Sequence, residues 1–249
     1  MCSLECIRLL SYPELSEDLI RKRLSKLLSL GFRSCVDLGD HELWGLKVLG
    51  KGHSSVVLAA EFANLGYVAV KVLRTDSKRD SLTLECDLMK RATPIAPEIY
   101  YCDEEFIIME LIKGVKLGDV APNITSCRDL IMLYLKVLAA ARYLDSKNIT
   151  HKELNILREH VIIDDEGKIR IIDFESGFTG FACNVCRVFS SLFMRDRRII
   201  ECCSLKQDQK GLLLELLSSY KKTNSDILFT RLVKTIIDLC GSSSCECVG

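Results

Sequence analysis

The sequence has no excess charge of either sign and no long hydrophobic run. Its 34 basic and 34 acidic residues cancel, so charge gives no argument for a nucleic-acid or membrane-surface partner. No apolar stretch approaches the roughly 20 residues that a helix needs to cross a bilayer. The first ten residues carry Glu5 and Arg8 within an apolar stretch and lack the layout of a signal peptide. We therefore expect a cytoplasmic globular protein with no membrane partner.

Cysteine, by contrast, is abundant, with thirteen residues in a chain of 249. Most of them stand singly in apolar runs, and cytoplasmic thiols are mostly reduced, so we interpret them as small buried hydrophobic residues. Disulfides stay open as an alternative. So does a four-sulfur zinc site made of Cys183 and Cys186 with Cys245 and Cys247, although the spacing of the second pair is unusual for zinc. The single cysteines include Cys86, Cys127 and Cys240.

The first 40 residues have the pattern of a helical segment. Ser11 and Glu14 can form a capping box, and leucines then recur at helical spacing as far as Gly31. No motif in this segment carries chemistry. We expect a short helical extension over residues 1–40, either packed on the next domain or used for docking.

From Leu43 the pattern changes to five apolar-rich runs that are typical of strands, with one helical segment near 80–92. This pattern predicts a five-stranded sheet with one helix, which ends at Lys113 and Gly114. The five runs are Leu43–Leu49, Val56–Phe62, Tyr67–Leu73, Ile99–Cys102 and Phe106–Ile112.

The second half of the chain is mainly helical. Ser126 and Asp129 have the spacing of a capping pair at the start of a long helix. A short hairpin follows, in which the apolar runs 161–163 and 169–172 flank a polar turn. Further helices are predicted near 182–194, 208–221 and 225–240.

A glycine-containing turn joins the first two predicted strands. Glycine has no Cβ, so the backbone N–H groups of such a turn can approach phosphate oxygens closely. An ordinary glycine hairpin would give the same pattern, and this motif alone does not decide between the two. As a phosphate cradle, the turn would use Gly50, Lys51, Gly52, His53, Ser54, Ser55 and Val57.

A lysine, Lys71, lies near the end of the third apolar run, Val68-Ala69-Val70-Lys71. A buried lysine is costly unless its charge is paired, although a lysine at a strand end can also extend its amine to the surface. Glu85 in the following helical segment is the candidate partner. Asp87 is the second choice, because it falls on a different face of that helix.

Two more motifs carry carboxylates in the second half. His151-Lys152-Glu153-Leu154 follows the long helix, and Asp173 directly follows the second strand of the hairpin. An aspartate at that place can meet a cation at the edge of the core, or it can simply be a turn residue that caps a loop. For a lone histidine such as His151, a packed loop position is the favoured interpretation.

In their order and spacing, these motifs resemble those of the protein-kinase superfamily, over roughly residues 43–200. The series runs from the glycine turn through the strand lysine and the helix glutamate to His-x-Glu, the hairpin and Asp-Phe. The sequence looks most like the small atypical kinases of the RIO type, especially the archaeal predicted serine/threonine kinases. The matching segments are 151–154, 160–161 and 173–176.

That resemblance implies an α+β, two-lobed kinase fold. The extension at 1–40 would precede an N-lobe at 41–114, with a five-stranded antiparallel sheet and a helix, and a mainly helical C-lobe at 115–249. It also implies ATP and Mg²⁺ (or Mn²⁺) as cofactors, with transfer of the γ-phosphate to a hydroxyl of an unidentified protein substrate. A small-molecule kinase and a nucleotide-binding scaffold without turnover are the alternatives.

The resemblance assigns nucleotide-binding roles to residues of the first half. Adenine would bind backbone groups between Glu110 and Ile112, with Ala69 also among the binding residues. Lys71 would hold the phosphates, and Glu85 would fix Lys71.

The resemblance also assigns roles in the second half, where the sequence departs from the kinase pattern. Asp173 would bind the cation, and Glu153, where kinases have aspartate, would accept or orient the hydroxyl proton. Kinases have a metal-binding asparagine seven residues after the histidine, but Arg158 stands there. A loop two residues longer would bring His160 to that place, although imidazole is a poor ligand for Mg²⁺. Asn155 is the alternative oxygen ligand.

The segment after Asp173 is short and contains no Ala-Pro-Glu element. The sequence therefore predicts either constitutive activity or a substrate recognised elsewhere, such as at the N-terminal helices. Arg195, Arg197 and Arg198 form a small basic cluster, which we interpret as a solvated helix end.

Overall fold

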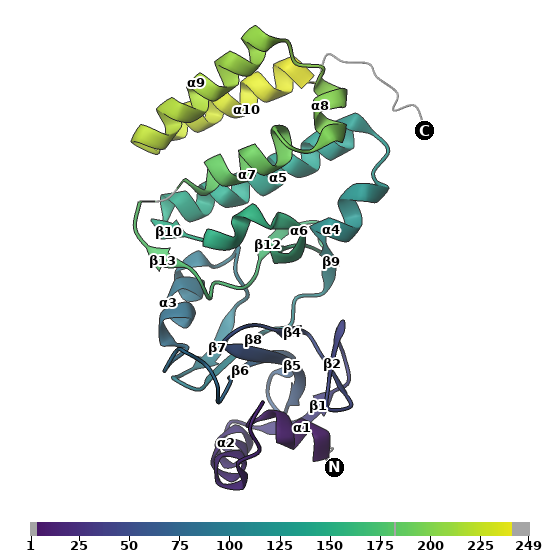
Figure 1. Ribbon diagram of the computed structural model, residues 1–249, viewed down its shortest axis with the longest axis vertical. Coiled ribbons are helices and arrows are strands. Elements are labelled where there is room, and N and C mark those ends of the chain that lie inside the picture. The colour runs from purple at the N-terminus through teal and green to yellow at the C-terminus, as the bar shows by residue number, and fades with distance from the viewer. Residues whose placement is uncertain (1–3, 182, 241–249) are drawn as a thin grey trace. The chain divides into compact units, whose positions relative to one another are not determined.

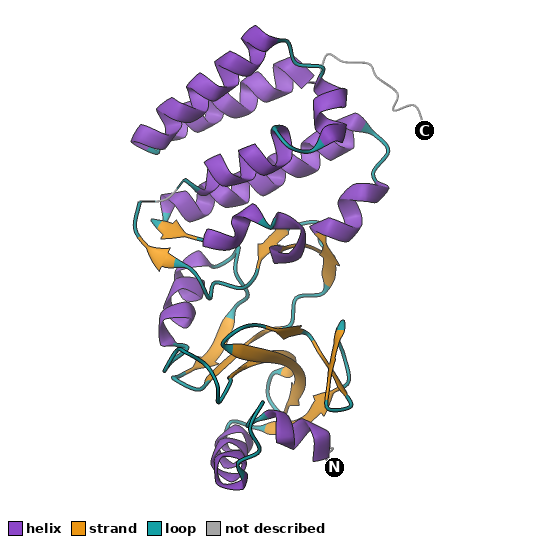
Figure 2. Cartoon of the chain, viewed as in Figure 1, coloured by secondary structure: helices purple, strands orange, loops and turns teal. Residues whose placement is uncertain are grey.

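The computed structural model describes residues 4–181 and 183–240 (Figure 1). The chain divides into two compact units. Unit 1 consists of Met1–Thr93 and Pro97–Leu111, and unit 2 consists of Pro94–Ala96 and Ile112–Gly249. Long strands occur in unit 1 and most of the long helices in unit 2 (Figure 2). The helices and antiparallel sheets agree with the predicted α+β class.

An antiparallel sheet of six strands forms the centre of unit 1. Its order is β1-β5-β6-β8-β7, and β4 also pairs with β5. The predicted five-stranded sheet is therefore corrected, because one strand comes from the N-terminal segment and another from the glycine turn. The strands are β1 (Phe32–Val36), β4 (Gly50–Lys51), β5 (Ser55–Phe62), β6 (Gly66–Leu73), β7 (Ile99–Cys102) and β8 (Phe106–Glu110).

The predicted helical extension is wrong at its C-terminal end, where the chain forms β1. Gly31 has a φ of 94°, a conformation that glycine adopts without steric cost, and it interrupts the helical segment. Phe32 then pairs with Phe62 of β5, and their ring centroids are 5.7 Å apart. Burial of Phe32 against a long-range partner thus decides the local structure, which a pattern within residues 1–40 cannot reveal.

The helices of the N-terminal segment are α1 (Leu4–Leu9) and α2 (Glu17–Ser29). The predicted capping box of Ser11 and Glu14 is wrong, because α2 has Ser16 as its N-cap. The physical reason is Pro13, whose ring disfavours a helical conformation for the residue before it. The Ser11 hydroxyl instead donates to the backbone carbonyl of Glu14.

The predicted strand Leu43–Leu49 is shorter in the structure and lies outside the main sheet. It forms β3 (Leu46–Val48), which pairs with β2 (His41–Leu43) in a hairpin. The connecting residues Trp44 and Gly45 have φ values of 51° and 83°. Two positive φ values in a two-residue turn match the twist of a tight hairpin, which explains why the run divides there.

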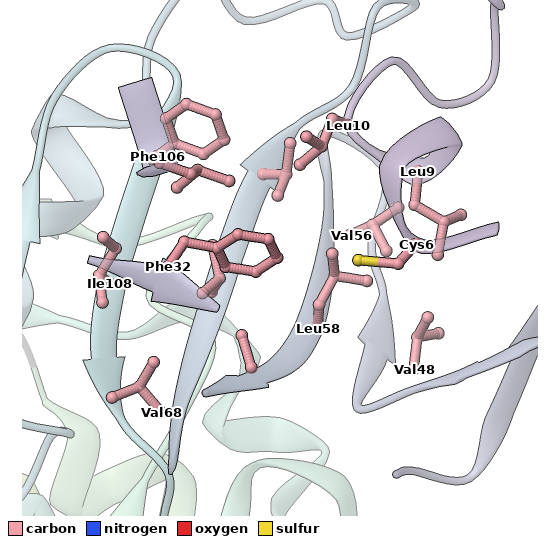
Figure 3. Close-up of a cluster of buried hydrophobic side chains, with 14 of the residues drawn as sticks. Cys6, Leu9, Leu10, Phe32, Val48, Val56, Leu58, Val68, Phe106 and Ile108 are labelled. Atoms are coloured by element: carbon pink, nitrogen blue, oxygen red, sulfur yellow. The ribbon is translucent and has the colours of Figure 1, made fainter. Parts of the chain in front are cut away.

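The N-terminal helices contribute to the hydrophobic core of unit 1. Figure 3 shows Cys6 and Leu9 of α1 beside Val56 and Leu58 of β5, and all four are buried. Arg23 of α2 is also buried, and it donates from Nη1 to the carbonyl oxygens of residues 10 and 73 at 2.6 and 2.9 Å. Residues 4–30 are therefore an integral part of unit 1.

Unit 2 is built around α5 (Cys127–Ser146). The side chain of Ser126 accepts a hydrogen bond from the backbone N–H of Asp129, which confirms the predicted cap. The predicted hairpin is present as β11 (Val161–Asp164) and β12 (Ile169–Ile171), and β9 (Gly114–Lys116) adds a third strand that the sequence did not indicate. Three helices follow the predicted pattern, namely α7 (Asn184–Phe193), α9 (Gln207–Thr223) and α10 (Asp226–Cys240).

The basic cluster near residue 197 is not simply a solvated helix end. Residues 197–203 form α8, and Arg198 is half-buried. Its guanidinium donates to the carbonyl oxygen of Ala121 at 2.5 Å and to that of Ile124. Arg195 and Arg197 remain exposed. Arg198 thus joins α8 to the segment that precedes α5.

The interpretation of the cysteines as small buried hydrophobic residues needs the largest correction. All ten cysteines within the described residues form disulfides, so Cys86, Cys127 and Cys240 are not isolated buried thiols. Cys183 pairs with Cys186, which leaves neither of them as a zinc ligand. Cys245 and Cys247 lie outside the described residues. The five pairs are Cys6–Cys35, Cys86–Cys102, Cys127–Cys202, Cys183–Cys186 and Cys203–Cys240.

None of the described helices combines the length and the apolar character needed to cross a bilayer. The longest, α5, spans 20 residues but carries charged side chains along its length.

Candidate functional site

In unit 1, the structure brings Lys71 together with Glu85. Lys71 lies on β6, which is paired on both sides, and Glu85 lies in the first turn of α3 (Thr83–Ala92). The amine Nζ is 2.5 Å from Oε1 of Glu85, and the two side chains are 5% and 1% exposed. Asp87 is exposed, so the second-choice partner is not used. The lysine does not extend to the surface.

A pair buried this deeply is not explained by stability alone. Moving two charges out of water carries a desolvation penalty that their attraction often only offsets. If the role of the pair were only structural, two apolar residues of similar size would stabilise the fold equally well. The pair instead holds an amine at a fixed place, and the disulfide between Cys86 and Cys102 joins α3 to β7 directly beside Glu85.

The glycine turn lies between β4 and β5. Gly50 pairs with Val57, and the N–H of Gly52 donates to the carbonyl of Ser55 at 2.9 Å. Arg74 holds the turn, since its side chain donates to the carbonyl of Gly52 at 2.8 Å and its N–H to the carbonyl of Ser54 at 2.8 Å. The backbone of the turn is thus fixed.

The side chains of the turn differ in exposure. Lys51 and His53 are exposed, whereas Ser54 and Ser55 are buried. The hydroxyl of Ser54 has no hydrogen-bond partner among the described residues. Lys51 also lies over the ring of Tyr12, with its Nζ 5.4 Å from the centroid.

The remaining residues predicted to bind nucleotide lie within a strand, at a strand end and just after one. Ala69 is buried on β6. Glu110 ends β8, and its backbone N–H already donates to the carbonyl of Glu98 at 2.8 Å. Ile112, half-buried, is the first residue after the boundary of unit 1. Their roles stay predictions.

In unit 2, Glu153, His160 and Asp173 come together. One ligand atom from each lies within 4.8 Å of the others, and all three residues are half-buried. Glu153 comes from the 3-10 helix Lys152–Asn155, and His160 ends α6 (Leu157–His160). Nε2 of His160 is 3.2 Å from Oε2 of Glu153. Asn155 is exposed at the end of its helix, and its role as a metal ligand stays a prediction.

Asp173 has an unusual backbone conformation. Its φ is 63°, in the left-handed region that few residues other than glycine, asparagine and aspartate adopt. Strain of this kind concentrates at functional sites, where the surrounding structure holds it in place. The next residue, Phe174, is fully buried and anchors the segment.

His151 is fully buried, and it supports the carboxylate segment instead of facing solvent. Its Nε2 lies 3.1 Å from the carbonyl oxygen of Ile172, and its ring meets Phe174 edge to face at 4.8 Å. A carbonyl can only accept, so Nε2 carries the proton. Burial, more than any neighbour, lowers the pKa of His151 to about 4, which keeps the ring neutral.

A buried polar network holds the backbone at Ile149 and His151 in place. No motif in the sequence indicated this network. Asn184 accepts from the backbone N–H of His151 at 3.1 Å and donates to the carbonyl of Ile149 at 2.7 Å. Asp145 accepts from the backbone and side chain of Asn184 and from the hydroxyl of Tyr220. Burial raises the pKa of Asp145, against the hydrogen bonds that it accepts.

The cluster in unit 2 fits a divalent cation, because it offers two carboxylates and one imidazole. Carboxylate oxygens suit Mg²⁺, whereas the imidazole of His160 suits transition ions. A cation bound there would neutralise the two carboxylates and attract phosphate oxygens.

A buried lysine–glutamate pair after a glycine turn, and an aspartate beside a glutamate at the end of a hairpin, define a kinase-like protein. Comparison with protein families agrees. A model of the family described as protein tyrosine and serine/threonine kinase matches residues 44–178, more than half of the chain. The chain belongs to this family, which confirms the resemblance to the protein-kinase superfamily. All the residues of the two clusters lie within the matched segment.

Proposed function

We propose that the protein is an ATP- and Mg²⁺-dependent protein kinase that transfers the γ-phosphate to serine or threonine, of the small atypical RIO-like kind. Membership of the kinase family supports the transfer of phosphate. The buried pair of Lys71 and Glu85 carries the proposal for this chain, because it holds an amine at a fixed place in the sheet, as kinases do to bind the phosphates of ATP.

The other residues would act in defined ways. Lys71 would hold the α- and β-phosphates, and the backbone of the glycine turn would cover them. Asp173 would hold the cation, whose charge would offset that of the phosphates. Glu153 would accept the proton of the substrate hydroxyl or orient that hydroxyl. His151 would keep the Asp173 segment in place through the carbonyl of residue 172.

The test is phosphate transfer from γ-labelled ATP by the purified full chain, with Mg²⁺ or Mn²⁺ and with added protein substrates. We expect label in the wild type and a loss of at least about 10²-fold in Lys71→Ala and in Asp173→Ala. Lys78→Ala is the matched control, because Lys78 is exposed in unit 1. Phosphoamino-acid analysis after acid hydrolysis of the labelled protein would distinguish phosphoserine and phosphothreonine from phosphotyrosine.

Each outcome decides between the proposals. Nucleotide binding by wild type with no label under either metal would contradict the kinase and favour a nucleotide-binding scaffold. Label only on a small molecule would favour a small-molecule kinase. Label that survives both variants would contradict the assigned roles, provided that circular dichroism shows all variants to be folded.

A further inference from the structure

The backbone fixes His160 and Asp173 beside each other. β11 and β12 are antiparallel, with Val161 opposite Ile171. The residue before β11 and the residues after β12 therefore lie at the same end of the hairpin. The N–H of Ile172 donates to the carbonyl of His160 at 3.0 Å, which continues the pairing by one step. The proximity of the two side chains is thus a property of the hairpin, not of a mobile loop.

Glu153 completes the cluster from the preceding 3-10 helix. Its carboxylate is 3.2 Å from Nε2 of His160, and the three ligand atoms lie within 4.8 Å of one another. Ligand atoms around one transition ion are about 3–4 Å apart, because each metal bond is about 2.0–2.2 Å long. Small side-chain rotations therefore suffice to bring the three atoms onto one ion.

The chemistry of the three ligands is not that of a magnesium site. Mg²⁺ binds oxygen and keeps several waters, whereas imidazole with carboxylates suits Mn²⁺, Co²⁺ and Zn²⁺. Two carboxylates so close together also repel, and a divalent ion removes that repulsion. Nε2 of His151 is held by the carbonyl of Ile172, and the group of possible ligand atoms in this part of the described chain consists of Glu153, His160 and Asp173.

We propose that Glu153, His160 and Asp173 form a mixed nitrogen–oxygen site for one divalent first-row transition ion, which binds there in preference to Mg²⁺. The site lies wholly in unit 2 and binds its ion without nucleotide. It rests on the proposed function and changes it in two respects: an ion such as Mn²⁺ would replace Mg²⁺, and Glu153 would orient the substrate hydroxyl while it also binds the ion. Its test does not depend on phosphate transfer.

The experiment measures metal binding by the full chain without nucleotide. Free Mn²⁺ is followed by its electron paramagnetic resonance signal, and Mg²⁺ competes for the bound ion. Co²⁺ serves as a second probe, because its visible absorption spectrum reports coordination and changes when a nitrogen ligand is lost. We expect one Mn²⁺ per chain with a Kd at least about tenfold below that of Mg²⁺.

The decisive variant is His160→Asn, which replaces the imidazole with an oxygen ligand. We expect it to lower the ratio of Mn²⁺ affinity to Mg²⁺ affinity by about tenfold or more and to change the Co²⁺ spectrum. Glu153→Gln should weaken the binding of both Mn²⁺ and Mg²⁺. His41→Asn is the matched control, because His41 is exposed on β2 in unit 1 and is not one of the three ligands of the cluster; it should leave the ratio unchanged.

The alternative is that His160 merely pairs with Glu153. In that case His160→Asn would leave the ratio and the Co²⁺ spectrum as in the wild type, and this result would overturn the proposal. Equal affinity of wild type for Mn²⁺ and Mg²⁺ would overturn it too. Thermal unfolding of each variant would show that it is folded. If the wild type binds Mn²⁺ selectively but transfers no label from ATP, only the kinase function is contradicted. If it transfers label but shows no preference for Mn²⁺, only the metal site is contradicted.

Discussion

At the scale of single residues, Asp145 shows how a buried carboxylate can organise a loop to which it contributes no catalytic group. It lies at the end of α5 and is fully buried. It accepts hydrogen bonds from the N–H groups of Asn184 and Val185 at 2.7 and 3.2 Å, and so caps α7 from another helix. Asn184 in turn holds the backbone of His151.

We predict that Asp145→Asn lowers the free energy of unfolding by about 3 kcal/mol. The two side chains have the same shape, but the amide NH₂ would face donors at positions where a carboxylate oxygen now accepts. One of these donors is the hydroxyl of Tyr220, at 2.9 Å. Urea unfolding followed by circular dichroism measures the loss.

Asp129→Asn is the matched control for that variant. Asp129 lies in the first turn of the same helix, and it is exposed. Its substitution should change the free energy of unfolding by no more than about 0.5 kcal/mol. Equal effects of the two substitutions would contradict the account of Asp145 as the buried acceptor of the network.

At the scale of secondary-structure elements, a buried guanidinium helps to attach α2 to the rest of unit 1. Arg23 donates to two backbone carbonyls and, through Nε, to Oε1 of Glu105 at 3.2 Å. The carbonyls belong to Leu10 and to Leu73, the last residue of the strand that carries Lys71. The N-terminal segment therefore stabilises the strand that holds the candidate phosphate-binding lysine.

We predict that Arg23→Met lowers the free energy of unfolding by about 2–4 kcal/mol, because it leaves two buried carbonyls without this donor. Arg21→Met on the same helix is the control, since the side chain of Arg21 is 74% exposed and its ion pairs are at the surface. Urea unfolding measures both. A loss in Arg21→Met as large as that in Arg23→Met would show that general helix effects, and not the buried hydrogen bonds, decide the result.

Some elements could be predicted from the sequence because their signals are local. The cap of α5 by Ser126 and the β11–β12 hairpin depend on residues a few positions apart. β1 could not be predicted, because Phe32 forms a strand only by pairing with β5, some 30 residues later.

The same distinction applies to the candidate site. The order of a strand lysine and a helix glutamate made the pairing of Lys71 with Glu85 a natural hypothesis. The distance between Glu153 and His160 depends on the short α6 between them, and a pattern of residue types does not fix the fold of such a loop. The network of Asp145 and Asn184 depends on two residues that lie 39 positions apart in the chain. Burial of polar side chains is invisible in the sequence when their partners are distant.

At the scale of the whole molecule, covalent bonds cross-link both units. Two disulfides lie in unit 1, and three lie in unit 2. Disulfides persist in oxidising compartments and are rare in the cytoplasm, with proteins of hyperthermophiles as an exception. The expected cytoplasmic location and the five disulfides therefore exclude each other in an ordinary reducing cell, and the oxidation state of the purified protein decides between them.

Loop length makes a graded prediction for these cross-links. Cys127–Cys202 joins residues 75 positions apart, whereas Cys183–Cys186 joins residues three apart. In the chain-entropy account, loss of the first should lower the free energy of unfolding by about 4 kcal/mol and loss of the second by about 2 kcal/mol. Double alanine variants of each pair, unfolded by urea without reductant, measure the two losses. Similar losses for both pairs would contradict the entropic account.

Thiol titration gives the matching chemical test. Of thirteen cysteines, ten are paired, so at most three thiols should react when the oxidised chain is unfolded without reductant. Reduction should expose all thirteen and lower the midpoint of urea unfolding, since each opened loop adds conformational freedom to the unfolded chain. If protein purified under conditions that preserve its cellular oxidation state already has thirteen reactive thiols, the cross-links are absent in the cell. The hydrophobic cores of the two units must then hold the fold alone.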